Sequence, residues 1–83
     1  MPQLWIVLVS LMRQEMKDLS IKFGLKLRSR RKELGISQDK MAILADIDRS
    51  YAGRVERGEV KISLEKAYKL AYILKCDVRE LLP

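Results

Sequence analysis

The chain has 83 residues and a mass of 9.7 kDa, which allows one domain and excludes a large enzyme with a separate substrate domain. Its net charge of +6 and its hydrophobic content of 48% indicate a folded protein with an anionic partner. It has no histidine and one cysteine, Cys76, which excludes a disulfide framework, a Cys/His zinc site and His-based catalysis. We therefore expect a cytoplasmic binding module without cofactor or metal.

The positive charge is concentrated in one segment. Residues 1–16 are neutral, whereas residues 17–35 carry seven basic and two acidic side chains. Residues 36–62 are neutral again, and residues 63–83 add a single positive charge. A basic stretch on an otherwise neutral domain is typical of a nucleic-acid binder, although a solvated helix face has the same composition.

The amino end carries an apolar run, Leu4 to Met12, interrupted only by Ser10. This run is far shorter than the roughly 20 residues that cross a bilayer, and it lacks the basic residues and cleavage site of a signal peptide. Three interpretations stay open. The run is an extra element packed on the domain or across a dimer, a partner-binding segment, or read-through upstream of a start at Met12 or Met16. We assign residues 1–16 to an apolar extension and residues 17–83 to the domain.

A helix of about four turns is predicted from Leu19 to Gly35, because apolar residues recur there at helical spacing between Lys and Arg. Ser37 is a good N-cap for a second helix, and Asp48 for a third that Gly58 stops. Ser63 caps a predicted fourth helix, and Asp77 a short fifth one, from Val78 to Leu82. The prediction is an all-α chain of five helices, with a strand pattern conceivable only in the apolar amino end.

Two short helices joined by a few residues, the second of which begins on a polar cap, form the helix-turn-helix arrangement. The first helix braces the second so that its amino-terminal residues enter the major groove of DNA. Ala42 supplies the small residue needed where the two helices cross. Asp46 stands in the turn at a position that requires a left-handed backbone.

The segments FGLKLRSRRKELGISQDKMA (23–42) and DRSYAGRVERGEVKISLEKAYKLA (48–71) carry a family resemblance. From Phe23 to Leu74 the chain resembles the Cro and phage-repressor type of helix-turn-helix domain, which implies a compact lambda-repressor-like fold. Within it, DRSY, GRVERG and ISLEK are similar to the controller proteins of restriction-modification systems, small dimeric regulators that time endonuclease expression. The resemblance leaves the apolar amino end uncovered.

The resemblance implies DNA contacts for side chains of the second motif helix and its surroundings. Arg49 is the favoured base reader, because its forked donors can bind O6 and N7 of guanine together. Tyr51 is a further base contact or else covers the helix crossing. The base contacts implied are Arg49, Ser50, Tyr51 and Arg54; the phosphate contacts are Gln38, Arg28, Arg57 and Lys61, of which the charged ones are alternatively plain solvated charges.

Other residues are given structural roles first. Arg31 and Glu56 occupy positions where similar repressors place an ion pair that links the first and third helices. Gly53, inside the recognition helix, indicates a close backbone approach to DNA or to a neighbouring helix. A homodimer is implied because one recognition helix reads too few base pairs to select a site. The candidate dimer interface is Tyr68, Tyr72, Ile73, Val78, Leu81 and Leu82, unless most of these pack beneath the third helix.

The sequence thus predicts a sequence-specific transcriptional regulator that binds a palindromic operator in double-stranded DNA as a dimer. The favoured form is a restriction-modification controller that regulates its own promoter. The alternatives are an antitoxin with Leu4–Met12 as its toxin-binding segment, a phage-type repressor, and a bridging coactivator, which the forked donors of Arg49 and Arg54 argue against.

An enzyme is not expected, because no spacing sets a nucleophile beside a base and no glycine-rich phosphate loop is present. We expect a cytoplasmic, nucleoid-associated protein that does not bind membranes. RNA polymerase is a further candidate partner, contacted through Glu56 or Glu59.

Overall fold

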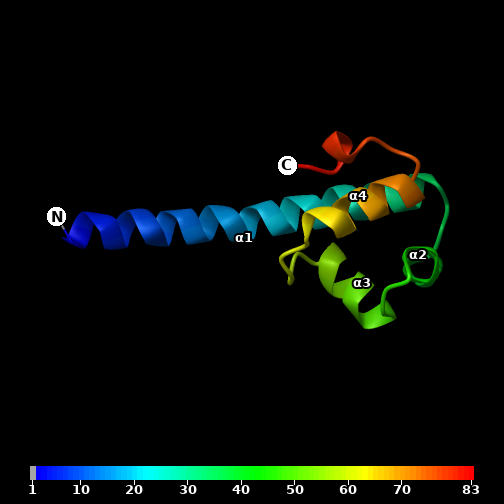
Figure 1. Cartoon of the computed structure of the whole chain (residues 1–83), viewed down its shortest axis with the longest axis horizontal. Helices are drawn as coiled ribbons and strands as arrows, with labels where there is room; N and C mark the ends of the chain where they lie inside the picture. Colours follow the sequence, from blue (N-terminus) through cyan, green and yellow to red (C-terminus); the bar gives the residue numbers. More distant parts are fainter. Residues whose placement is uncertain (1) are drawn as a thin grey trace.

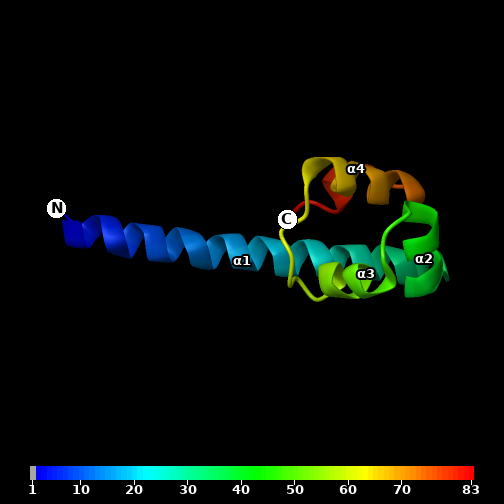
Figure 2. The same cartoon turned by 60° about the horizontal axis from the view of Figure 1, so that its bottom comes forward.

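The computed structural model describes residues 2–83, and over this range the regular structure is entirely helical (Figure 1). The first helix is much longer than the rest, and short helices follow it at one end (Figure 2). The elements are α1 (Pro2–Glu33), α2 (Gln38–Ala45), α3 (Arg49–Glu56), α4 (Leu64–Ile73) and the 3₁₀ turn η1 (Val78–Glu80). The principal extents of 51 × 24 × 19 Å reflect the length of α1.

The predicted count of five helices is wrong, because residues 78–80 form a single 3₁₀ turn. Its hydrogen bonds join residues three apart, from the Leu81 amide to the Val78 carbonyl at 2.9 Å. Asp77 and Glu80 form a reciprocal capping box around this turn. The cap predicted at Asp77 is therefore present, but it starts a turn and no α-helix.

Helix α1 also differs from the prediction, because it runs without a break across the proposed boundary between residues 16 and 17. The residues in this stretch, Arg13 to Lys17, are good helix formers, and neither glycine nor proline interrupts them. The apolar run is thus the first part of α1 and has no strand character. Met1, which the assignment of residues 1–16 includes, lies outside the described residues, and the division into two domains stays a prediction.

Residues 20–33 of α1 form one wall of the domain. Phe23 and Leu27 are buried among side chains of the later helices. Gly24 lies where α1 crosses α3: a Cβ atom there would be 2.5 Å from the carbonyl oxygens of Val55 and Glu56. The glycine therefore lets the two backbones touch, and any side chain would push the helices apart.

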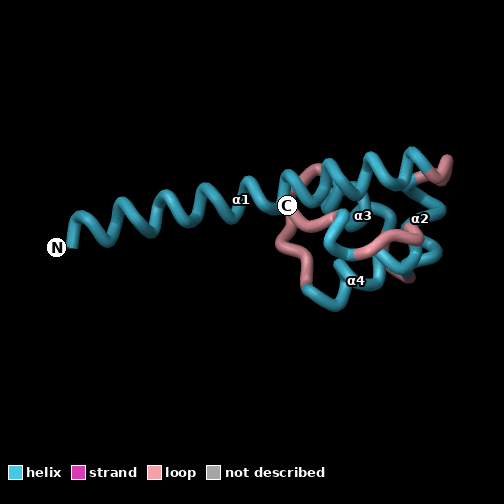
Figure 3. The backbone as a smooth tube through the Cα atoms, turned by 90° about the horizontal axis from the view of Figure 1, so that it is seen from above, coloured by secondary structure: helices cyan, strands magenta, loops and turns pink. Residues whose placement is uncertain are grey.

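The remaining helices close the core on one side of this part of α1 (Figure 3). Ser37 and Ser63 cap α2 and α4 by accepting hydrogen bonds from the amides of Lys40 and Lys66 at 3.0 and 3.2 Å. Helices α2, α3 and α4 and the segment after α4 contribute these buried apolar side chains to the core: Met41, Ala42, Ala45, Ala52, Val55, Ala67, Leu70, Ala71, Leu74, Val78 and Leu81.

Residues 3–19 of α1, which we call the arm, project beyond the domain (Figure 1). No side chain of the arm is buried, and only Val9 is half-buried. Of the interpretations open for this apolar run, packing against its own domain is therefore wrong. The sequence resembles that of a core helix, but within a single chain no other element covers it.

Candidate nucleic-acid interface

Helices α2 and α3 meet at a short turn with the geometry predicted for a helix-turn-helix. Asp46 has a left-handed backbone, with φ 52° and ψ 48°, and its amide bonds back to the Ala42 and Ile43 carbonyls. The left-handed position predicted for Asp46 is thus confirmed. Ala42 and Ala52 are buried between the helices, so the two axes approach closely. The turn and these small residues fix the angle at which α3 leaves α2.

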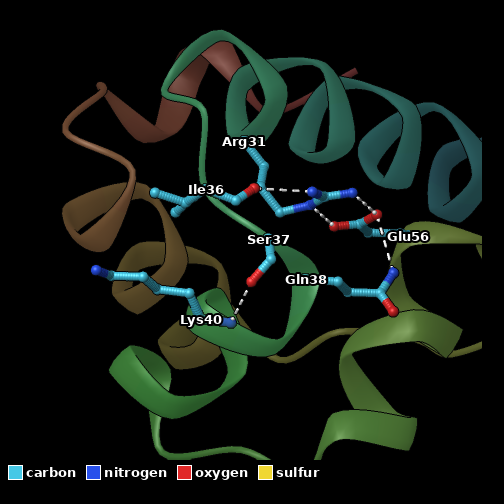
Figure 4. A network of polar contacts seen from close by, with 6 residues as sticks. All are labelled: Arg31, Ile36, Ser37, Gln38, Lys40 and Glu56. Atoms are coloured by element: carbon cyan, nitrogen blue, oxygen red, sulfur yellow. Dashed lines mark hydrogen bonds and ion pairs between the residues drawn. The ribbon is translucent and has the colours of Figure 1, made fainter.

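A buried polar network ties α3 to the rest of the domain (Figure 4). The Arg31 guanidinium on α1 donates to both carboxylate oxygens of Glu56, from Nε at 2.6 Å and from Nη2 at 3.0 Å. It also donates to the Ile36 carbonyl at 2.9 Å. Gln38, at the start of α2, donates to Glu56 Oε1 at 3.1 Å. Three helices therefore converge on one carboxylate.

The network is satisfied as well as buried. Arg31 and Glu56 are 9% and 6% exposed, and among the described residues no buried side-chain nitrogen or oxygen lacks a partner. The hydrogen bonds to Glu56 raise the pKa of Arg31 above its ordinary value. The ion pair that the resemblance implied is formed, and it holds α3 in place for whatever its outer surface contacts.

The outer side chains at the start of α3 are exposed and polar. The Arg49 side chain is 77% exposed and forms an ion pair through Nε with Asp39 Oδ1 of α2 at 2.7 Å. Asp48 does not cap α3 with its side chain; its Oδ2 accepts a hydrogen bond from Ser50 Oγ at 2.7 Å, which lowers the pKa of Asp48. Arg54, one turn further, is exposed.

Tyr51 lies apart from these side chains. It is half-buried against the core, and the Lys66 ammonium of α4 sits 4.4 Å from the centre of its ring. This is cation–π geometry, which joins α3 to α4. The position fits the interpretation that Tyr51 covers a helix crossing better than the interpretation that it reads a base.

A shallow surface hollow gathers five of the proposed DNA contacts: Gln38, Arg49, Ser50, Arg54 and Arg57. Asp48, Gly53 and Glu59 complete its lining. A Cβ atom on Gly53 would lie 3.0 Å from Arg57 Nη1 and 3.3 Å from Gln38 Oε1, so this glycine leaves space for two polar side chains and not for a backbone. The hollow presents three arginines beside two carboxylates.

Two of the proposed phosphate contacts, Arg28 and Lys61, are not part of this hollow. Arg28 is exposed on α1, and Lys61 is exposed in the loop between α3 and α4. Arg57 forms a 2.5 Å ion pair with Glu59, whose pKa it lowers through that hydrogen bond. The assignments of base and phosphate contacts stay predictions.

The proposed dimer interface needs correction. Val78 and Leu81 are buried in the core of the single chain, because η1 folds back under α4, so they are not available to a partner. Tyr68, Tyr72 and Leu82 are exposed, Tyr72 by 86%. Ile73 is half-buried. A groove with an apolar side formed by Leu44, Tyr72 and Ile73 is also lined by Lys75, Cys76, Asp77 and Glu80, and Leu44 is half exposed there.

Sequence reasoning missed three structurally important residues. Asp39 holds Arg49 from the neighbouring helix. Arg30 donates to the Leu74 and Lys75 carbonyls at 3.0 and 2.9 Å, which ties α1 to the end of α4. Gly24 permits the crossing of α1 and α3. A glycine inside a strong helical pattern was the one signal available for Gly24, whereas the partners of Asp39 and Arg30 depend on how the helices fold together.

Neither a metal site nor a membrane span is indicated in residues 2–83. No three His, Cys, Asp or Glu side chains in this range cluster as metal ligands would. None of the helices here is both long enough and apolar enough to span a bilayer.

The family model of helix-turn-helix proteins matches residues 27–81, more than half of the chain. Control protein C.MunI from a Mycoplasma species is 37% identical over 67 residues, which cover 80% of this chain and 90% of that protein. The restriction-modification controller protein C.AhdI from Aeromonas hydrophila has a similar crystal structure, with a TM-score of 0.72 and 47% identity over 75% of this chain and 94% of that one.

The crystal structure of the hypothetical transcription factor NHTF from Neisseria is also similar, with a TM-score of 0.76 and 31% identity over 82% of this chain and 78% of that one. The family match begins at Leu27, so the arm lies outside it.

Proposed function

This chain belongs to the helix-turn-helix family, and we propose that it is a restriction-modification controller that binds a palindromic operator as a dimer and regulates its own promoter. The similarity to two control proteins of this class supports the assignment. The observation that carries it is the surface hollow along α3, where three arginines and a glutamine converge beside Asp48 and Glu59.

The hollow has the composition of a DNA-reading surface. A recognition helix enters the major groove with its amino-terminal residues at the base edges. Asp39 holds Arg49 through Nε, which leaves the terminal amino groups Nη1 and Nη2 as donors to O6 and N7 of guanine. Arg54 and Arg57 lie further along the helix, where they serve as base or phosphate contacts. The buried Arg31–Glu56 pair anchors this helix to α1.

The dimer is part of the proposal. Two recognition helices must be held about 34 Å apart to read successive major grooves. The groove that Leu44, Tyr72 and Ile73 line together with Lys75, Cys76, Asp77 and Glu80 supports a dimer at this end of the domain, and Tyr68 and Leu82 are further exposed apolar side chains.

We also propose a binding protein that is not an enzyme and that acts in the cytoplasm on nucleoid DNA. Of the two carboxylates considered for a contact with RNA polymerase, Glu56 is excluded because it is buried and paired with Arg31. Glu59 is exposed, and its ion pair with Arg57 would have to open for such a contact.

An Arg49→Ala variant tests the role of the hollow. We expect the free energy of binding to an operator selected from random duplexes to become less favourable by about 1–3 kcal/mol, and the preference at one base position to relax. The measurement is a titration of labelled duplexes at fixed salt. Arg79→Ala is the matched control, because it removes another exposed arginine that is paired with an aspartate and that lies in η1, outside the hollow.

Equal loss on operator and random DNA would assign Arg49 to phosphate alone. If selection enriches no sequence at all, the chain is not a sequence-specific regulator.

A further inference from the structure

The arm presents large apolar side chains to solvent. Leu4, Trp5 and Ile6 are 60%, 69% and 66% exposed, and several more apolar side chains up to Met16 are about half exposed. Residues 3–16 have no net charge, because Arg13 and Glu15 cancel. A neutral helix gains no electrostatic attraction to DNA or to an anionic lipid surface. Its partner must therefore offer apolar surface.

The apolar residues of the arm include a regular seam. Trp5, Val9, Met12, Met16 and Leu19 follow one another in alternating steps of four and three residues. This is the spacing of the contact positions in a coiled coil, where such residues form a stripe along one face of a helix. Val7 and Leu11 lie off this stripe. The arm thus carries a contact surface suited to another helix of the same kind.

The position of the domain decides how a second helix can lie on the seam. The next step of four along the seam is Phe23, which is buried in the core, and the buried Leu27 lies one turn further on the same side of α1. It therefore faces the side of α1 on which α2, α3 and α4 lie (Figure 3). A parallel partner would run into the domain beyond Leu19. An antiparallel partner runs the other way, and each domain then lies beyond the first turn of the opposite arm.

A groove lies at the base of the arm, where α1 meets the loop after α3. Its lining consists of Arg13, Met16, Lys17, Ser20 and residues 58–61. Met16 belongs to both the seam and this groove. An antiparallel arm that lies on the seam brings its own first turn, with Leu4 and Trp5, to the groove. The exposed apolar first turn of the arm and a groove that can bind it thus occur on the same chain.

We propose that two copies of this chain pair through antiparallel arms, with Trp5 of each seated at the groove at the base of the other. In this register Trp5 faces the partner's Met16, and Val9 faces the partner's Met12. If one arm were shifted by one heptad toward the partner's domain, Arg13 would lie beside Arg13 of the other copy, and Glu15 beside Glu15 of the other copy. Repulsion between these like charges favours the register that pairs Trp5 with Met16. The proposal does not depend on DNA binding.

This contact is separate from the apolar groove of Leu44, Tyr72 and Ile73. That groove is lined by α2, the end of α4 and residues of the segment 75–80, on the domain and away from the first turns of α1 (Figure 1). A chain can use both surfaces at once, so the arms join dimers that form at the other end.

The single tryptophan of the sequence, Trp5, reports on the arm directly. On dilution of the full-length protein, we expect its emission to move to longer wavelength as the arms separate and the indole becomes hydrated. Association through the Tyr72 groove leaves Trp5 untouched, and so does loss of DNA binding. Failure of this proposal is therefore distinguishable from failure of the proposed function.

Two matched variants locate the seam. Val9→Glu places a carboxylate in the seam, and we expect it to raise the concentration at half-maximal shift by about tenfold or more. Val7→Glu makes the same change off the seam and should alter that concentration by less than about twofold. Circular dichroism checks that both variants stay folded. An emission that does not depend on concentration, or equal effects of the two variants, would overturn the proposal.

Cross-linking tests the orientation. In a Cys76→Ser background, a mixture of Val9→Cys and Met12→Cys chains should form a disulfide between copies, because these positions face each other in the antiparallel register. Each variant alone should cross-link far more slowly. Rapid cross-linking of Val9→Cys with itself would indicate parallel arms and contradict the register.

Discussion

The arm and residues 20–33 belong to one continuous helix, yet their surroundings differ completely. The arm contains the most apolar run of the sequence, Leu4–Met12, and none of its side chains is buried. Residues 20–33 include most of the basic excess, and they nevertheless supply Phe23, Leu27 and Arg31 to the core. Apolar content therefore indicates which residues favour burial, but it does not indicate which of them are buried within a single chain.

The difference arises from what folds back on each part. Gly24 lets α3 cross α1 at backbone contact, and Gly58, with φ +72°, packs against Ile21. No later element reaches back beyond the groove at residues 13–20. The comparison predicts that matched substitutions in the two parts of α1 will have very different effects on the stability of the domain.

The largest difference in the free energy of unfolding is expected between substitutions of one arginine in each part of α1, Arg31 and Arg13. Arg31→Met leaves the Glu56 carboxylate buried without its partner, and we expect the free energy of unfolding to fall by about 3–5 kcal/mol. Arg13→Met makes the same change on the arm and, at a protein concentration low enough to keep the arms separate, should alter the free energy of unfolding by less than about 0.5 kcal/mol. Urea denaturation followed by circular dichroism measures both. Similar losses would show that the arm is part of the cooperative unit.

A pair of leucines sharpens the comparison without any charge. Leu27 is fully buried, so Leu27→Ala should cost about 2–5 kcal/mol through the cavity it leaves. Leu11→Ala truncates an exposed side chain off the seam and should stay within about 0.5 kcal/mol of the parent protein. Thermal unfolding at low protein concentration gives the two values. An equal cost for Leu11 would place that side chain in a contact that the single chain does not show.

The smallest effect is expected at the edge of the domain, where polar groups are as exposed as those of the arm. Hydrogen bonds from Arg79 lower the pKa of Asp77 from 3.8 to about 2. Because the pKa in the folded state is the lower one, the stabilisation is fully present above about pH 4 and disappears as the pH falls through about 2. The measurement is unfolding against pH, with Asp77→Asn as control. The parent and this variant should converge at low pH; a constant gap between them would contradict the assignment.

Much of the domain could be predicted because local signals were strong. Ser37, Ser63 and Asp77 occupy the caps that their side chains indicated, and Asp46 adopts the left-handed backbone expected in the turn. Two elements differ from the prediction: α1, which begins far before Leu19, and the segment after Asp77, where the local signal was short. Five residues after Asp77 cannot distinguish one 3₁₀ turn from a short helix.

The candidate site was predicted in part for a similar reason. The family resemblance implied Arg49 and Arg54 as contacts, and both lie exposed in the hollow along α3. The partners of those residues come from other elements. Three features depend on how the helices pack. Asp39 pairs with Arg49, Lys66 lies over the ring of Tyr51, and Val78 and Leu81 are buried in the core.

The sequence by itself determined the all-helical class, the helix-turn-helix pair and the chemistry of its outer surface, because caps, turns and helical spacing act over a few residues. Only the tertiary structure decided that the apolar amino end continues α1 into solvent. Whether an apolar face is covered depends on where distant segments go. In this chain α3 packs against residues 20–33 and Arg30 ties this part of α1 to the end of α4, whereas no later helix covers the arm.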